Sequence, residues 1–508
     1  MRALISVANR EGVTRLAQEL GDLGVSLFSP ENTRRTLQEA GIQAAPIEEL
    51  TQLPAILDGK LQKMHYTLLA GIMARRDHPR HKEDLRVHQI EPIDVVVINF
   101  PAFSVKQGIS TTEIMEQVDI GSETLVRAAA SNFSDVLVLV RPQDYGLVLQ
   151  EWREQGEVSE GTRRRLAAIA FQYAASYASV IAEYLRSSGG DLFPDELTLP
   201  LRYVQALRYG ENPQQRAALY RWVMPSQPDT PHGACVEPSL ATSEMLQGEE
   251  LSYNNLLDLN VAIEAASSFT VPAVAIIKHT NPCGLACGDT LLEAYQQAHA
   301  GDPIPASGGI VGCNREVNGD VAHELSQLFY EAVVAPSFSK EALSLLRKKP
   351  AMRLIATHCL HKPQKRSTHG LKKELRPEYP LDVRSIQGGL LLQTPDYQGE
   401  QEIEYTVVTE RDPNLEEVTD LMFAWKVVRL VKSNAIVLAH KLSLIGVGAG
   451  QMSRLASVQL ALEKAGSRAR GSVLAADAYF PFPDGVEAAA RAGVTAIIQP
   501  GELGVTKK

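Results

Sequence analysis

The sequence lacks a long hydrophobic run: no window of its 508 residues holds eighteen consecutive apolar residues, so no membrane span is expected. It has only five cysteines, an odd number in a large chain, which disfavours a disulfide framework and fits a reducing cytoplasm. Lysines and arginines are scattered and the net charge is −10, so the sequence shows no basic patch that would bind nucleic acid. The apolar N-terminal run is too short for a signal peptide and predicts a first β-strand instead.

The cysteines and histidines also lack the spacing of a zinc site. Cys283 and Cys287 form a CxxxC pair, and His358, Cys359 and His361 lie close together in the sequence. Zinc ligands usually come as two closely spaced pairs, so ordinary thiols and a polar loop are the better interpretation. No zinc is therefore expected.

What the sequence does contain is an alternation of short apolar strands and amphipathic helices. Four early segments read as strands, at residues 3–7, 25–28, 94–100 and 135–140. Apolar residues spaced three and four apart over 13–23 mark one face of a helix. Such alternation predicts an α/β fold, with a parallel sheet covered by helices on both faces.

The chain is too long for a single hydrophobic core, so more than one domain is expected. A long helix is predicted over 161–185, and the Ser-Ser-Gly-Gly run at 187–190 after it indicates a boundary. A second segment, starting near Thr198, again mixes strands and helices.

The most distinctive local motif is Ile276-Ile277-Lys278-His279-Thr280-Asn281-Pro282-Cys283-Gly284, in which a buried strand ends in a Lys-His pair. Ionisable residues at the end of an α/β strand stand where such sheets usually build their sites. His279 can take a proton from a nucleophile, and Lys278 can stabilise developing negative charge or protonate a leaving group. The pattern alone favours a simpler interpretation, in which His279 caps a turn and Lys278 points into water.

Three further polar clusters accompany this motif, at Arg208–Pro213, Leu251–Asn255 and Lys432–Ala435. The Arg208 guanidinium fork suits a phosphate or a carboxylate. Taken singly, each cluster is typical of a turn or a helix cap. The glycines of Ile445–Gly450 are spaced G-x-G-x-G rather than G-x-G-x-x-G, so a tight strand-to-helix turn is expected there and not a nicotinamide site.

Taken in order, six long motifs resemble the bifunctional aminoimidazole carboxamide ribotide (AICAR) formyltransferase/inosine monophosphate (IMP) cyclohydrolase family of purine biosynthesis. They are RYGENPQQ, LQGEELSYNNLLDLN, IIKHTNPCG, FAWKVVRLVKSNAIV, GVGAGQMSR and ADAYFPFPDG. The resemblance covers nearly the whole chain. It implies an N-terminal domain at 1–190 that closes the purine ring on a parallel-sheet fold similar to methylglyoxal synthase. It also implies a formyltransferase domain at 198–508 made of two cytidine-deaminase-like subdomains without the deaminase zinc.

The resemblance further implies the substrates and the assembly. The formyl donor would be 10-formyltetrahydrofolate and the acceptor AICAR, in a cytoplasmic homodimer with formyltransferase sites at the subunit interface.

Site residues follow from the same resemblance. The lone pair of the acceptor amine is delocalised into the imidazole ring, so His279 would act as its base. Lys278 would assist the departing folate nitrogen or the tetrahedral oxyanion, and Asn434 would polarise the formyl group. The implied substrate-binding residues are Arg208 and Tyr209, expected from the partner subunit, with Gly308 and Glu331. The implied folate-binding residues are Asp477 and Arg454.

The C-terminal region departs from the family pattern in two places. Ser307 stands where the family usually has Phe, and Pro305 where Ser is usual. The sequence also ends at Lys508, before an expected basic-aromatic tail whose Arg binds the ribotide phosphate. Loss of such a contact in a partly buried pocket is expected to weaken binding by about 2–5 kcal/mol.

The N-terminal domain departs further. Gln62 stands where the catalytic Lys is expected, Pro101 where a site Tyr belongs, and Ser131 in place of another site Lys. The remnants of the cyclohydrolase site are Arg10, Lys63, Asp119 and Arg127. The sequence therefore predicts AICAR formyl transfer with an impaired or absent cyclohydrolase.

Two alternatives stay open at this point. The chain is fully bifunctional if Lys63 and Arg10 substitute in the first site. A divergent paralogue would instead make a related formylated metabolite, or bind purine intermediates without catalysis.

Overall fold

A computed structural model describes residues 1–54, 56–105, 108–189, 192–223, 239–358, 381–396 and 405–501. Cys359, His361, the last residue of the predicted boundary at 190, and the final residues 502–508 lie outside the described residues. The chain forms two compact units, the first mainly Met1–Arg202 and the second mainly Tyr203–Arg221, Pro231–Leu371 and Asp382–Lys508. Within the described ranges, no helix is long and apolar enough to cross a membrane.

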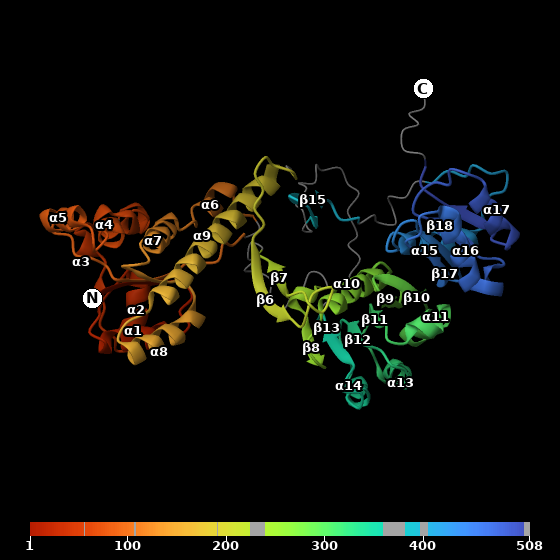
Figure 1. The fold of residues 1–508 in the computed structure, drawn as a ribbon, viewed down its shortest axis with the longest axis horizontal. Helices are drawn as coiled ribbons and strands as arrows, with labels where there is room; N and C mark the ends of the chain where they lie inside the picture. Colours follow the sequence, from red (N-terminus) through yellow and green to blue (C-terminus); the bar gives the residue numbers. More distant parts are fainter. Residues whose placement is uncertain are drawn as a thin grey trace, which may run out of the picture. The chain divides into compact units, whose positions relative to one another are not determined.

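The first unit, drawn in red and orange in Figure 1, is built on five parallel strands, whose order is β3-β2-β1-β4-β5. The strands are β1 (Arg2–Val7), β2 (Ser26–Ser29), β3 (Ala45–Pro46), β4 (Val95–Asn99) and β5 (Leu137–Leu139). The helices are α1 (Val13–Asp22), α2 (Glu31–Glu39), α3 (Glu48–Thr51), α4 (Tyr66–Met73), α5 (Pro79–Val87), α6 (Thr111–Met115), α7 (Ile120–Ser131), α8 (Tyr145–Gln155) and α9 (Glu160–Gly189).

Successive residues of its central strands enter opposite cores, as the two-residue period of a strand requires. In β4, Val95 and Val97 pack with α1 and α8, whereas Val96 and Ile98 pack with α4, α7 and α9. Because both faces are buried, β4 is apolar throughout instead of alternating with polar residues. The predicted parallel α/β sheet is confirmed.

The second unit is built on a ten-stranded mixed sheet, in the order β19-β18-β16-β17-β10-β9-β11-β12-β13-β8. The strands are β8 (Glu244–Gln247), β9 (Ala273–Lys278), β10 (Asn281–Cys287), β11 (Ile310–Cys313), β12 (Ala332–Ala335), β13 (Arg353–Ala356), β16 (Ile436–His440), β17 (Ser443–Gly448), β18 (Val473–Ala476) and β19 (Ala496–Ile498). The helices are α10 (Tyr253–Ser267), α11 (Leu291–Gly301), α12 (Pro303–Ala306), α13 (Gly319–Gln327), α14 (Lys340–Leu346), α15 (Leu415–Val428), α16 (Arg454–Ala465) and α17 (Asp484–Arg491). Two separate ribbons pair β6 (Leu201–Leu207) with β7 (Ala217–Trp222), and β14 (Asp382–Ile386) with β15 (Gly389–Gln393).

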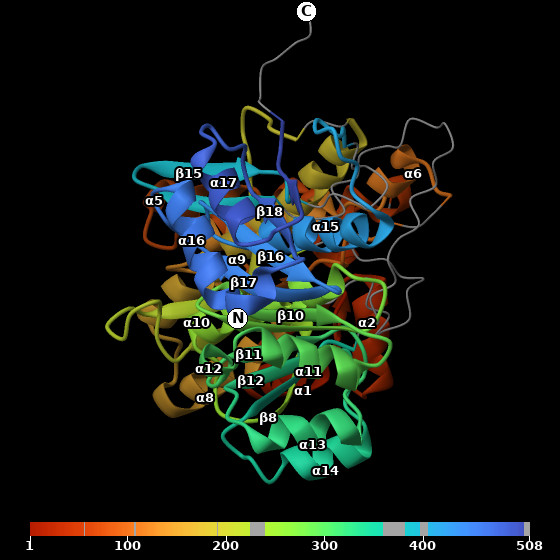
Figure 2. The same cartoon turned by 90° about the vertical axis from the view of Figure 1, so that its right-hand side faces the viewer.

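This sheet consists of two halves with the same local topology. The series β10-β9-β11-β12 in the first half and β17-β16-β18-β19 in the second have two antiparallel pairings followed by a parallel one. The halves meet where β10 pairs with β17, near the middle of the sheet in Figure 2. Helices α10 and α15 share one core on one face, while α11, α13 and α14, and separately α16 and α17, cover the other.

Candidate active site

The Lys-His motif lies at a sharp turn in the first half of the sheet. Lys278 ends β9 and Asn281 begins β10, so His279 and Thr280 alone connect the two antiparallel strands. Both have left-handed backbones, with φ of 54° and 59°, as tight hairpin turns require. The carboxylate of Asp258, on α10, accepts hydrogen bonds from the backbone N–H groups of His279 (3.1 Å) and Thr280 (2.6 Å). A helix-borne carboxylate thus fixes the turn that presents His279.

The two side chains of the motif differ in their surroundings. The half-buried Lys278 donates from Nζ to the Ser307 carbonyl at 2.8 Å. His279 is exposed, and its ring has no hydrogen-bond partner among the described residues. Both line a cavity of about 250 Å³, whose other walls are Asn281, Pro282, Cys283, Pro305, Val447, Ala449, Leu460 and Lys464.

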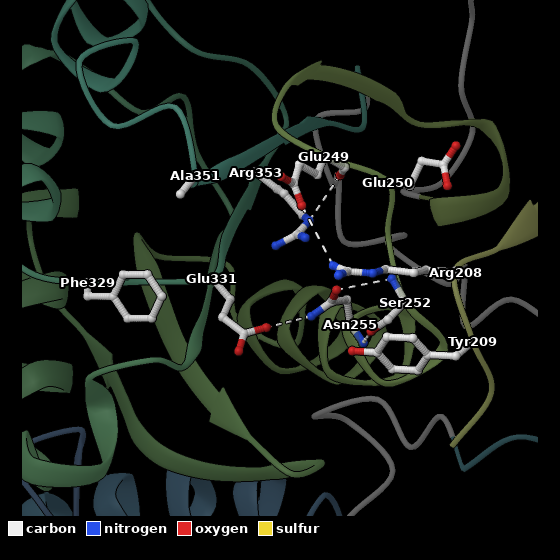
Figure 3. Close-up of a pocket in the computed structure, with 10 residues that line it drawn as sticks. All are labelled: Arg208, Tyr209, Glu249, Glu250, Ser252, Asn255, Phe329, Glu331, Ala351 and Arg353. Atoms are coloured by element: carbon white, nitrogen blue, oxygen red, sulfur yellow. Dashed lines mark hydrogen bonds and ion pairs between the residues drawn. The ribbon is translucent and has the colours of Figure 1, made fainter. Parts of the chain in front are cut away.

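Three of the predicted substrate residues line a second cavity, of about 270 Å³ (Figure 3). They are Arg208, Tyr209 and Glu331. Arg208 follows β6, and its guanidinium lies 3.7 Å from the Glu249 carboxylate. Glu331 precedes β12 and accepts a 2.7 Å hydrogen bond from the Asn255 amide, in the first turn of α10. The β6–β7 ribbon brings Arg208 and Tyr209 to Glu331 of their own chain, and their expected origin in a partner subunit stays a prediction.

Gly308 lies between Lys278 and this second cavity. Its φ is +77°, which favours glycine, and its N–H donates to the Phe329 carbonyl at 2.8 Å. A Cβ at this position would be 3.7 Å from Lys278 Nζ and 3.8 Å from the Phe329 ring, and Phe329 lines the cavity. The Lys278 amino group therefore lies beside the wall of the Arg208–Glu331 cavity.

The predicted folate residues Arg454 and Asp477 converge on Asn434. Arg454 donates to Asp477 Oδ1 at 2.7 Å and to Asn434 Oδ1 at 2.9 Å, while Asn434 Nδ2 donates to the Gln451 carbonyl at 2.8 Å. Burial raises the pKa of the Asp477 carboxyl, but hydrogen bonds from Ser433 and Arg454 outweigh burial and hold that pKa below its ordinary value. The three side chains therefore form one charged, bonded cluster.

The loop that carries Asn434 is connected to the His279 turn through the side chain of Asn281. The N–H of Lys432 donates to Asn281 Oδ1 at 3.2 Å, and Asn281 Nδ2 donates to the His279 carbonyl at 2.9 Å. The loop that carries Asn434 thus lies against the first residue of β10.

In the first unit, Lys63 and Asp119 form an ion pair at 2.7 Å. Ser122 Oγ lies 2.7 Å from both partners, and its N–H donates to Asp119 Oδ1 at 2.9 Å, at the start of α7. Burial raises the pKa of the Asp119 carboxyl, but the Lys63 ammonium and the Ser122 donors outweigh it and lower that pKa. Gln62 points elsewhere and donates to Glu48 at 2.5 Å.

The other two cyclohydrolase remnants lie outside this pair. Arg127 is exposed and has its nearest carboxylate partner in Glu123, 3.5 Å away on the same helix. Arg10 is exposed in the turn after β1, where its carbonyl accepts from the Val13 N–H at 3.3 Å. The structure therefore brings Lys63 and Asp119 together but not Arg10 and Arg127.

Sequence reasoning missed Asp258 and Arg353. Asp258 lies three residues after Asn255 and therefore on the same face of α10, close to the start of the helix. This spacing could have identified Asp258 from the sequence. Arg353 begins β13 and lines the second cavity. An Arg before a short apolar run is common, so nothing in the local sequence marks Arg353 as a site residue. Within the described ranges, no group of three His, Cys, Asp or Glu side chains is arranged to hold a metal.

Comparison with known proteins identifies the family. The family model described as "AICARFT/IMPCHase bienzyme" matches residues 129–464, and the "MGS-like domain" model matches residues 12–124.

Two relatives are named "Bifunctional purine biosynthesis protein PurH". The one from Anoxybacillus flavithermus is 44% identical over 98% of this chain and 94% of its own length, and the one from Bacillus subtilis is 42% identical over the same shares. A solved structure titled "Crystal structure of ForH" is 28% identical and covers 36% of this chain and 98% of its own, with a TM-score of 0.34. The chain therefore belongs to the AICARFT/IMPCHase bienzyme family, which confirms the predicted AICAR formyltransferase of purine biosynthesis with 10-formyltetrahydrofolate as co-substrate.

Proposed function

We propose that formyl transfer takes place beside Lys278 and His279, with the ribotide bound in the cavity of Arg208, Tyr209 and Glu331. The amine nitrogen of AICAR forms a bond to the formyl carbon, and the bond from that carbon to the folate nitrogen then breaks. His279 receives the proton that the amine loses, because a delocalised amine is a weak nucleophile without a base. Lys278 stabilises the tetrahedral oxyanion or protonates the departing folate nitrogen; where it only stabilises the oxyanion, the proton held by His279 passes to that nitrogen.

The observation that supports this best is the fixed turn at His279. A left-handed backbone at a residue other than glycine costs free energy and persists only where the surroundings hold it, and such residues cluster at functional sites. Here the Asp258 carboxylate holds the turn, and the imidazole is exposed. A base with a fixed backbone and an accessible ring suits proton abstraction from a bound amine.

On the folate side, we assign Asn434 to the formyl group and Asp477 with Arg454 to the folate. Arg454 donates a hydrogen bond to the side-chain carbonyl oxygen of Asn434. The side-chain amide of Asn434 donates one of its two hydrogens to the backbone carbonyl of Gln451. The second amide hydrogen is then available to polarise a formyl oxygen. The nearby contact between Asn281 and Lys432 supports a common site with His279.

Incubation of the purified protein with AICAR and 10-formyltetrahydrofolate tests this function. We expect formation of tetrahydrofolate and formylated ribotide, with saturation in both substrates. Tight calorimetric binding of AICAR without turnover would instead indicate a non-catalytic binding protein, and turnover only with a different ribotide would indicate the divergent paralogue.

For the first unit, we propose that IMP cyclohydrolase activity is impaired or absent, although the relatives are named bifunctional. Lys63 is bound by Asp119 and Ser122, and the neighbouring Gln62 carries no charge. An ammonium neutralised by a carboxylate at 2.7 Å is poorly placed to stabilise negative charge on a substrate.

The alternative is full bifunctionality, with Lys63 acting in the first site. Purified protein supplied with the formylated ribotide distinguishes the two. We expect no IMP absorbance above the uncatalysed rate, whereas saturable IMP formation that is lost in Lys63→Ala would establish the alternative.

We also propose a cytoplasmic homodimer with the domain limits 1–190 and 198–508. The β14–β15 ribbon exposes Ile386 (51%), Leu390 (48%) and Leu391 (57%), and an isolated two-stranded ribbon is at best marginally stable in water. Burial against a second copy would remove this apolar surface from water. A solution mass equal to the 55.5 kDa protomer in sedimentation experiments would contradict the homodimer, and twice that mass is expected.

A further inference from the structure

Arg353 lines the second cavity but has no role in the function proposed above. It is the first residue of β13, and its backbone N–H donates to the carbonyl of Glu331 at 3.1 Å. Its Nε donates to the carbonyl of Glu249 at 3.0 Å. The aliphatic stem packs on Gly248, where a Cβ would lie 2.6 Å from Arg353 Cγ. The backbone and the stem of Arg353 are therefore held in place, and the Nε hydrogen bond orients its half-buried guanidinium.

The free end of that guanidinium points into the cavity. Figure 3 shows its two terminal nitrogens turned toward the space between Arg208, Glu331 and Ala351. Neither terminal nitrogen has a hydrogen-bond or ion-pair partner in the part of the chain that the structure describes. A half-buried, oriented and unpaired guanidinium is a strong candidate for binding an anion.

The charges around this space are two guanidinium groups and three carboxylates. Arg208 faces it from the segment after β6, and the carboxylates are those of Glu249, Glu250 and Glu331. Glu249 is 77% exposed and only 3.7 Å from Arg208, so this ion pair is weak. Glu331 is bonded to Asn255 at 2.7 Å, which holds it on the α10 side of the cavity. An anion that displaces Glu249 would therefore meet both guanidinium groups.

We propose that Arg353 is a substrate-binding residue that, with Arg208, holds the phosphate of the ribotide. This inference rests on the proposed function, since it takes the cavity as the ribotide site. A phosphate carries more charge than a carboxylate and accepts two hydrogen bonds from each guanidinium fork, so it competes effectively with Glu249. Lys278 lies beside the wall of the same cavity, which places the phosphate at Arg353 and the amine toward His279.

The test compares AICAR with its riboside, which lacks the phosphate, by calorimetry on the full chain. We expect Arg353→Gln to weaken AICAR binding by about 10- to 100-fold and to leave riboside binding and the KM for 10-formyltetrahydrofolate nearly unchanged. Arg347→Gln is the matched control: it makes the same charge change at an exposed residue just after α14, and we expect it to change neither affinity.

Each outcome bears on the proposal. Equal weakening of AICAR and riboside by Arg353→Gln would overturn it, because the side chain would then act on the shape of the cavity and not on the phosphate. An unchanged AICAR affinity would also overturn it. A wild-type protein that discriminates AICAR from riboside through Arg353 but shows no formyl transfer would refute the proposed function and leave the phosphate site standing.

Discussion

The carboxylate of Asp258 accepts hydrogen bonds from the backbone N–H groups of both His279 and Thr280, across more than twenty residues of sequence. The second half of the sheet repeats this arrangement. There, Asp420 accepts from the N–H groups of Lys441 and Leu442 at 2.8 and 2.7 Å, and both of these residues are also left-handed. The two turns are built alike, but only the first carries a histidine in the turn.

This repeat provides a matched pair of variants. In Asp258→Asn, an NH2 group replaces one of the two carboxylate oxygens. It then faces a backbone N–H, so one hydrogen bond is lost and the His279 turn should become less well fixed. We expect kcat to fall by about 10- to 100-fold, as expected when a catalytic group is displaced by about 1 Å. Steady-state kinetics with both substrates measure the change.

Asp420→Asn is the control, because its turn lies at the other end of β10. The Leu442 carbonyl accepts a hydrogen bond from the N–H of Cys287, the last residue of β10. Lys432, in the loop that carries Asn434, instead contacts Asn281, the first residue of β10. Both variants should lower the melting temperature to a similar extent, since each weakens two hydrogen bonds to a charged group. An equal loss of kcat in the two variants would show that Asp258 acts only through general stability.

A second prediction concerns Arg454, which contacts both Asp477 and Asn434. Arg454→Gln removes the charge that orients both side chains. We expect a higher KM for 10-formyltetrahydrofolate, by about 10-fold, and an AICAR affinity that changes little. Arg491→Gln, which breaks only an exposed ion pair with Glu487, should leave the kinetics unchanged, and a folate KM that stays at the wild-type value in Arg454→Gln would contradict the assignment.

A third prediction follows from the lowered pKa of Asp477. The carboxylate contributes stability that is fully present above its unfolded pKa of about 4 and is lost as the pH falls through the lower folded pKa. The difference in melting temperature between wild type and Asp477→Asn should therefore be largest near pH 6 and shrink toward about pH 3. A difference that stays constant over this range would show that Asp477 is not stabilised as an anion.

Local pattern was enough to predict much of the fold. The apolar run at 94–100 predicts a strand buried on both faces, and β4 has that environment. The G-x-G-x-G segment predicts a strand-to-helix turn, but Gly446 and Gly448 lie within β17 and only Gly450 lies in the connection to α16. Its glycines have a packing reason: a Cβ at Gly446 or Gly448 would lie 2.2 or 1.9 Å from a carbonyl oxygen of α16. The same close approach recurs at Gly284, against α11.

The site was only partly predictable, because its contacts join residues far apart in the sequence. Lys278 and His279 stand out as an ionisable pair at a strand end, which is a local signal. Asp258 and Arg353 do not, because their roles depend on how α10 and β13 pack beside that strand. Lys63 and Asp119 lie more than fifty positions apart; the family resemblance assigns both to one site, but only the structure shows that they form an ion pair.

The central claim is that His279 is the base in formyl transfer to AICAR. The most direct test measures single-turnover formylation of AICAR by 10-formyltetrahydrofolate in wild type and His279→Ala, with AICAR affinity determined in parallel. We expect the rate to fall by about 100- to 10,000-fold while the affinity stays within a few-fold of wild type. Retention of the wild-type rate in His279→Ala, with AICAR bound normally, would contradict the account.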